Sequence, residues 1–230
     1  RRNTARNERD GSRLNGLVYV LTIEYLYKCG VAFDLMTLED YLATRKDYDR
    51  VCFPNLTYVT DAERVALKAK LRRPGGSAVG MTAPGSATDA GFSGAAMSDL
   101  TGVTATGVAR RPRVVCRDAA ARASCGGKAF VKTLPGGAKS MIVPEPPRSP
   151  EDYAAILKEA GAWAYTATGN YFRRHGDVFM FHTGTPGTHT IRLPEKGVKV
   201  SELYTGAKYA SSELTLETDG PNTWLFKIER

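Results

Sequence analysis

The sequence has few of the residues that build metal centres and disulfide frameworks. It contains four cysteines and three histidines in 230 residues, with no CxxC pair and no zinc-finger spacing. Cys52 falls in an apolar run and Cys29 near a predicted helix end, where free cysteine acts as a small hydrophobic side chain. Only Cys116 and Cys125 can be considered for a bridge. The cysteines predict no metal site and no disulfide framework, and they leave the redox compartment open.

Long apolar runs are also absent. Residues 14–27 are fairly apolar, but the stretch is too short to cross a bilayer and includes Glu24. No signal peptide and no initiator methionine precede the arginine-rich start. We therefore expect no membrane partner and a chain that lacks an upstream part. The compartment stays unknown, with the cytoplasm and the periplasm both open to such a soluble chain.

Positive charge is in excess but does not form long blocks. The net charge is +8 and the isoelectric point about 9.3, yet no five consecutive like charges occur. Arginines gather mainly in residues 1–13, with smaller clusters at residues 72–73, 110–113 and 173–174. Basic charge alone gives only salt-sensitive, non-specific affinity for nucleic acid. Solvated surface is therefore the favoured interpretation, and a nucleic-acid partner is not expected.

Strands alternate with helices in the first part of the chain. Apolar residues at helical spacing predict a helix over residues 14–29, which Gly30 ends. Thr37 with Asp40 and Thr60 with Glu63 resemble capping boxes, which open two further helices. Strands are predicted at residues 31–36, 50–53 and 77–81. This order predicts a parallel sheet with right-handed crossovers, and a first strand upstream of residue 1.

The middle of the chain is rich in turn-forming residues. Residues 83–97 are predicted to be a long loop, and residues 134–147, with their glycines and prolines, a connector. Strands around residues 114–116 and 129–133 flank a Cys-Gly-Gly turn. Ser149-Pro150 has the signature of a helix start, with an N-cap serine followed by proline.

Beyond residue 165 the apolar period changes from 3.6 to 2. Short alternating strands separated by glycine-containing turns predict a small antiparallel sheet or sandwich. The predicted organisation is a linker (1–13), an α/β domain (14–143), a connector with a helix (144–165) and a C-terminal β-sandwich-like domain (166–230).

Several stretches of the chain together carry a family resemblance. They are Tyr48 to Asn55, Thr60 to Glu63, Gly75 to Val79, Thr88-Asp89, Ser98 to Val103, Phe181-His182, Ile191 to Pro194 and Val200 to Gly206. These stretches resemble the β-galactosidases and related glycoside hydrolases. The first part is similar to their amidotransferase-like accessory domain, often called the trimerisation domain, and the tail to their small terminal β domain. The resemblance implies a flavodoxin-like (class I amidotransferase-like) three-layer α/β domain followed by a small all-β antiparallel domain.

In that family the chemistry lies in an upstream (β/α)8 barrel. A barrel needs about 250 residues by itself, so this chain does not contain one. Its acids, among them Glu24, Glu39, Asp61 and Glu63, are better explained as surface and helix-cap residues than as a glycosidase pair. The resemblance thus implies a non-catalytic region that packs subunits or domains near an active site. Its expected partners are the upstream barrel and further copies of itself, a trimer being one such assembly.

A free-standing amidotransferase-like or esterase-like hydrolase is the first alternative. The nucleophile turn would follow residues 77–81, where Thr82 and Ser86 occur but no cysteine. The histidines, which would have to supply the base, all lie in the β tail, at His175, His182 and His189. We therefore assign no catalytic, cofactor-binding or metal-binding residue, and we expect no cofactor.

A carbohydrate-binding module is the second alternative. Aromatic rings offer flat apolar faces on which a sugar can stack, although most such rings pack in a core. The candidate sugar or interface contacts are Asn55, in the turn after the strand at residues 50–53, and the tail residues Trp163, Tyr165 and Tyr171.

Overall fold

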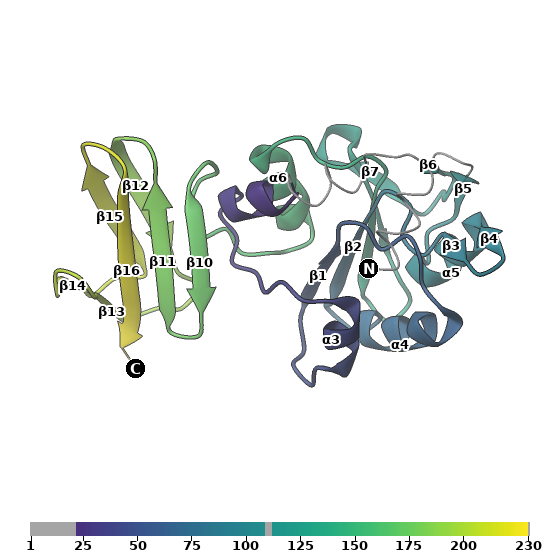
Figure 1. The fold of residues 1–230 in the computed structure, drawn as a ribbon, viewed down its shortest axis with the longest axis horizontal. Coiled ribbons are helices and arrows are strands. Elements are labelled where there is room, and N and C mark those ends of the chain that lie inside the picture. The colour runs from purple at the N-terminus through teal and green to yellow at the C-terminus, as the bar shows by residue number, and fades with distance from the viewer. Residues whose placement is uncertain (1–21, 109–111, 230) are drawn as a thin grey trace. The chain divides into compact units, whose positions relative to one another are not determined.

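The structure, a computed structural model, describes residues 22–108 and 112–229. Its contacts divide into two compact units, whose elements are drawn in Figure 1. Unit 1 is built on Met36–Arg148 and Glu159–Gly161, and unit 2 on Ile23–Leu35, Ser149–Lys158 and Ala162–Arg230. The predicted linker and the first part of the predicted helix at residues 14–29 lie outside the described residues.

Unit 1 is built on a mixed five-stranded sheet. In spatial order the strands are β1 (Arg50–Phe53), β2 (Ser77–Met81), β9 (Lys139–Val143), β8 (Ala129–Thr133) and β7 (Arg122–Ser124). β1, β2 and β9 run parallel, whereas β8 pairs antiparallel with both β9 and β7. The predicted strands at residues 50–53 and 77–81 are confirmed, as are their parallel pairing and the α/β class.

The predicted connector at residues 134–147 is wrong, because this stretch contains β9, the central strand of the sheet. Leu134 and Ala138 close a tight turn between β8 and β9, in which the Leu134 N–H donates to the Ala138 carbonyl at 2.7 Å. Gly136 and Gly137, with φ of 91° and 85°, supply the backbone conformation that this turn requires. The glycines and the prolines after Val143 therefore mark the two ends of a strand. The sheet is mixed for this reason, and not wholly parallel.

Three helices pack on one face of this sheet, the face that carries Phe53 and Ile142. They are α3 (Leu38–Ala43), α4 (Asp61–Leu71) and α5 (Gly94–Thr101). The capping box of α4 is confirmed: Glu63 N–H donates to the Thr60 hydroxyl at 3.3 Å, and Thr60 N–H donates to the Glu63 carboxylate at 2.8 Å. No helix within residues 22–108 and 112–229 is long and apolar enough to span a membrane.

Two predictions about local structure in this part are wrong. Residues 32–37 form no strand, and Val31 makes only a single bridge to Ala164. The predicted loop at residues 83–97 contains a short hairpin, β3 (Ala87–Thr88) with β4 (Gly91–Phe92), and the start of α5. The small residues that open α5 resemble a loop in composition, but they become helical because Met97 and Leu100 are buried.

The remaining strands of unit 1 follow α5. β5 (Ala105–Val108) pairs with β6 (Pro112–Cys116), and the turn η1 (Cys125–Gly127) separates β7 from β8. The predicted strands at residues 114–116 and 129–133 and the turn between them are thus confirmed. All four cysteines are free, so the bridge considered between Cys116 and Cys125 is not formed.

An ion pair between Lys132 and Asp118 holds the segments at Gly102 and Asp118 against the sheet. Lys132 of β8 donates to the Asp118 carboxylate at 2.7 Å and to the Gly102 carbonyl at 2.8 Å. The N–H groups of Thr104 and Ala120 donate to the same carboxylate at 2.9 and 3.0 Å. The Lys132 ammonium, with these N–H groups, lowers the pKa of Asp118 from 3.8 to about 2.

Unit 2 contains α6 (Pro150–Glu159) and two antiparallel sheets. The helix starts as predicted, since Asp152 N–H donates to the Ser149 hydroxyl at 3.2 Å. The five-stranded sheet has the order β10 (Tyr171–His175), β11 (Val178–Thr183), β16 (Asn222–Glu229), β13 (Lys199–Glu202) and β14 (Lys208–Tyr209). The two-stranded sheet pairs β12 (Gly187–Arg192) with β15 (Glu213–Thr218).

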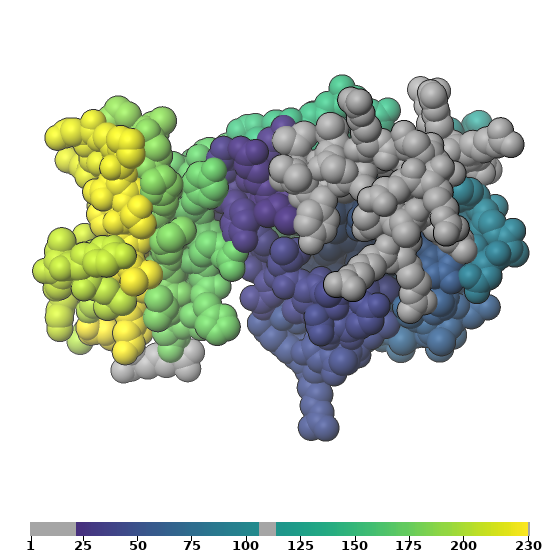
Figure 2. Space-filling view, viewed as in Figure 1, coloured from purple at the N-terminus to yellow at the C-terminus, as the bar shows by residue number. Residues whose placement is uncertain are grey.

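Both sheets of unit 2 contribute alternate residues to one core. Phe172, Phe179 and Phe226 of the larger sheet join Ile191 and Leu214 of the smaller one. Each of these side chains is at most 1% exposed. The predicted period-two β domain is therefore confirmed as a sandwich of two sheets (the green to yellow surface in Figure 2).

A segment that precedes the α/β sheet in sequence also belongs to unit 2. The Gly30 carbonyl accepts from Tyr165 N–H at 2.7 Å, and Ala32 packs against the β core. The Arg173 guanidinium lies 4.9 Å from the ring centre of Tyr27 and 5.6 Å from that of Phe33. These contacts complete the β unit with residues that lie far from it in the chain.

We predict that Asp118→Asn destabilises the protein at neutral pH by about 2 kcal/mol, because it removes a charge-assisted contact to Lys132. Since the folded-state pKa lies below the unfolded one, this stabilisation is full above about pH 4 and is lost as the pH falls towards 2. Urea unfolding of both proteins across this range measures the difference. Glu39→Gln, at an exposed acid of unit 1, is the control. A pH-independent gap between wild type and Asp118→Asn would contradict the assignment.

Candidate functional site

The carboxyl ends of β1 and β2 form the edge at which ligands usually bind in open α/β sheets. Asn55 lies half buried in the turn after β1, and its carbonyl oxygen accepts from Thr57 N–H at 2.8 Å. The next residues pair with the chain that follows β2: Leu56 O accepts from Gly85 N–H at 2.6 Å and Thr57 O from Ala87 N–H at 2.8 Å. The two loops therefore bind one another across this edge.

Thr82 occupies the turn directly after β2, where a nucleophile would stand. Its φ is 64°, one of two positive values at described residues other than glycine, and its side chain is only 5% exposed. The Thr82 N–H donates to the Val143 carbonyl at 2.7 Å, which extends the pairing of β2 with β9. Its hydroxyl has no hydrogen-bond partner. The turn thus has a strained backbone, and its side chain is shut off from solvent.

No base stands beside this hydroxyl in the described part of the chain. Ser86 is also fully buried without a partner for its hydroxyl. The three histidines all belong to unit 2, where His182 contacts the Thr223 hydroxyl at 2.8 Å and His189 the Thr185 carbonyl at 3.1 Å. A serine or threonine is a weak nucleophile until a base takes its proton. The described residues also contain no group of three metal-ligating side chains.

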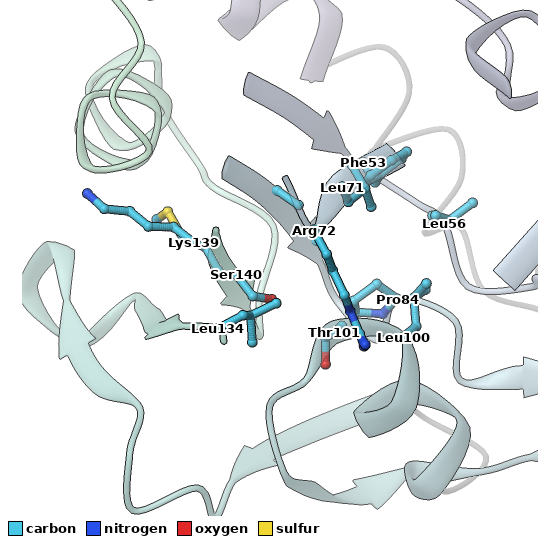
Figure 3. A pocket seen from close by; sticks show the side chains of 13 residues that line it. Phe53, Leu56, Leu71, Arg72, Pro84, Leu100, Thr101, Leu134, Lys139 and Ser140 are labelled. Carbon is cyan, nitrogen blue, oxygen red and sulfur yellow. The ribbon is translucent and has the colours of Figure 1, made fainter. Parts of the chain in front are cut away.

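Side chains of unit 1 fill the space beneath the edge. A Cβ added at Gly80 would lie 2.5 Å from Cγ of Pro84, so the proline ring packs directly on β2. Arg64, 6% exposed, donates to the carbonyls of Gly85 (3.0 Å) and Ala96. A cavity among Phe53, Pro84 and Leu100 (Figure 3) measures about 30 Å³. A cavity of this size holds on the order of one or two water molecules, and it is too small for a sugar or a glutamine.

The predicted aromatic contacts of the tail do not form one platform. Tyr165 stacks on Phe172 with 4.5 Å between ring centres, and the Arg174 guanidinium lies 5.8 Å from its ring. The side chain of Tyr171 lies on the face of β10 that points away from the core. Side chains of neighbouring strand residues point to opposite faces, and Phe172 is in the core. Tyr165 thus packs partly buried against the core, and its role in sugar or partner contact stays a prediction.

Trp163 has the most accessible ring of the three predicted aromatic residues. It is 48% exposed, and its indole N–H donates to the Arg192 carbonyl at 2.9 Å. The ring of Tyr171 is half buried, 5.8 Å from that of His182 and 5.2 Å from the Lys28 ammonium. A role of Asn55, Trp163 or Tyr171 in ligand or partner contact stays a prediction.

No protein-family model matches the chain, and no curated protein matches it. Solved structures do. The β-galactosidase from Bacillus circulans sp. alkalophilus matches with a TM-score of 0.57 and 14% identity over 89% of this chain and 36% of its own. The GH42 β-galactosidase Gan42B gives a TM-score of 0.58 and 15% identity, over 90% of this chain and 35% of its own. The β-galactosidase of the Antarctic haloarchaeon Halorubrum lacusprofundi gives a TM-score of 0.58 and 15% identity, over 93% of this chain and 35% of its own.

The chain therefore shares its fold with about a third of each of these β-galactosidases. The predicted fold class, an α/β domain followed by an antiparallel all-β domain, is confirmed. The chain spans about a third of the length of these solved structures.

Sequence reasoning missed the conformation of Thr82 and the neighbours of Trp163. A positive φ at a threonine has no signal in the sequence, since glycine would be the expected residue there. Arg192 and Glu213 can be placed on the outer face by period two, because Ile191 and Leu214 are apolar. The contact of Trp163 with the Arg192 carbonyl depends on which distant segment lies alongside β12, which the sequence does not encode locally.

We predict that Thr82→Gly is more stable than Thr82→Ala by about 1 kcal/mol. Both variants remove the unpaired hydroxyl, but only glycine adopts a φ of 64° without steric cost. Urea unfolding of the two variants measures the difference directly. Equal stability, or a more stable alanine variant, would show that the backbone is not strained at this turn.

Proposed function

We propose that the chain is a non-catalytic accessory region of a β-galactosidase-like glycoside hydrolase. The observation that carries the proposal is the fold match, which covers most of this chain and only about a third of each β-galactosidase. A region of this size and fold fits beside a catalytic domain and does not replace one.

The filled edge of unit 1 supports the same function. In an active α/β enzyme the carboxyl ends of the strands hold a nucleophile, a base and an open pocket. Here Thr82 is buried, and the three histidines of the chain all belong to unit 2. The cavity near these loops has a volume of about 30 Å³. The loops at this edge serve packing, either against an upstream (β/α)8 barrel near its active site or between copies of the chain in a homo-oligomer.

A free-standing amidotransferase-like or esterase-like hydrolase is not favoured by any contact in the described residues. Such an enzyme needs a hydroxyl or thiol within hydrogen-bond reach of a base. The Thr82 and Ser86 hydroxyls have no hydrogen-bond partner.

We predict that the full chain alone hydrolyses neither 4-nitrophenyl β-galactoside, 4-nitrophenyl acetate nor glutamine above the buffer rate. Thr82→Ala and Ser86→Ala should leave each rate unchanged, because neither hydroxyl is paired with a base. Colorimetric and ammonia-release assays measure these rates. Turnover that either substitution abolishes would overturn the non-catalytic assignment.

The gene offers a second test of the accessory role. The DNA upstream of the codon for Arg1 is expected to encode a (β/α)8 barrel of about 250 residues or more, with two catalytic carboxylates. An in-frame stop codon directly before Arg1 would contradict the proposed role.

A further inference from the structure

One end of the smaller sheet of unit 2 carries an exposed aromatic ring that is held in place. The indole N–H of Trp163 donates to the Arg192 carbonyl at 2.9 Å, and Arg192 N–H donates to the Tyr165 carbonyl at 2.7 Å. The segment of Trp163 therefore runs along the edge of β12. The hydrogen bond fixes the orientation of a ring that stays 48% exposed. A ring held in this way loses little conformational entropy when a ligand stacks on it.

Arg192, whose carbonyl accepts from the indole, also forms an ion pair with Glu213. Arg192 Nε donates to the Glu213 carboxylate at 3.0 Å, and the two side chains are 57% and 56% exposed. This is the single side-chain hydrogen bond that Arg192 makes among the described residues, so its two Nη groups keep their donors for solvent or a ligand. The pair offers donors and acceptors side by side, with no net charge.

The outer face of β12 and β15 continues the polar surface. Arg192 faces Glu213 in the register, Thr190 faces Thr215, and Thr188 faces Glu217. These residues alternate with the buried side chains of Ile191, Leu214 and Leu216, so they point away from the core. Hydroxyl and carboxylate groups thus extend from the ion pair along the strands.

We propose that Trp163, Arg192 and Glu213 form a binding site for a neutral pyranoside sugar. The C–H face of a pyranose ring is apolar and stacks on an indole, while its hydroxyls need donors and acceptors in one plane. Arg192 supplies the donors and Glu213 the acceptors. The neutral pair selects an uncharged ligand over an anionic one, because an anion would compete with Glu213 for the guanidinium.

The other exposed aromatic residue of unit 2 lacks this combination. Tyr204 is 70% exposed, its N–H is used by the Glu202 carboxylate at 3.1 Å, and its hydroxyl makes no hydrogen bond to a described residue, so its ring is not held as that of Trp163 is. Tyr204 therefore serves as the matched control. The proposal does not depend on the accessory role, since the site lies in unit 2 and its test measures binding without hydrolysis.

The test is a titration of the full chain with lactose, followed by the indole ¹H–¹⁵N signals of the two tryptophans and by calorimetry. We expect a dissociation constant on the order of 1 mM and a shift of the Trp163 signal that exceeds the shift of Trp224. Trp163→Ala should weaken binding at least tenfold. Glu213→Gln should weaken it severalfold, and Tyr204→Ala should not change it.

Circular dichroism and urea unfolding establish that each variant is folded before its affinity is compared. Added salt should leave the affinity unchanged, because the ligand is neutral. Three results would each overturn the proposal: no shift of the Trp163 signal at saturating lactose, full affinity in a folded Trp163→Ala variant, or binding that salt abolishes.

Discussion

The pairing of β2 with β9 is the contact on which unit 1 depends. It joins Ser77–Met81 to Lys139–Val143, two segments far apart in the chain, as parallel neighbours at the centre of the sheet. The ladder then continues beyond the strands, because the Thr82 N–H donates to the Val143 carbonyl. This last bond holds Thr82 at a φ that threonine disfavours. The central pairing therefore also sets the geometry of the turn where a catalytic group would stand.

That turn has the position of an active-site loop in an α/β sheet, but its side chains are buried. Pro84 packs on Gly80, and Arg64 binds the loop carbonyls. A buried guanidinium that donates to carbonyls fixes a loop firmly, because leaving its donors unpaired would cost several kcal/mol. Rigidity of this kind suits a surface that packs against another domain. It does not suit a site that must admit a substrate.

The strands of unit 2 have buried residues on one face and exposed residues on the other. The inward residues of both sheets, such as Phe172 and Leu214, make one core. Trp163, Arg192 and Glu213 lie outside this core and are exposed. The segment with Tyr27 and Phe33, held by Arg173, shows that this sandwich also draws on chain that precedes the α/β sheet.

The sequence by itself determined the features that depend on neighbours in the chain. The capping box of Thr60 and Glu63, the N-cap of α6 at Ser149 and the period-two strands of the tail all follow from local hydrogen bonds and alternation. Tertiary structure alone decided the place of β9, the φ of Thr82 and the approach of Trp163 to Arg192. Each depends on which distant strand lies alongside, and the free energy of such long-range pairing has no signature in a short stretch of residues.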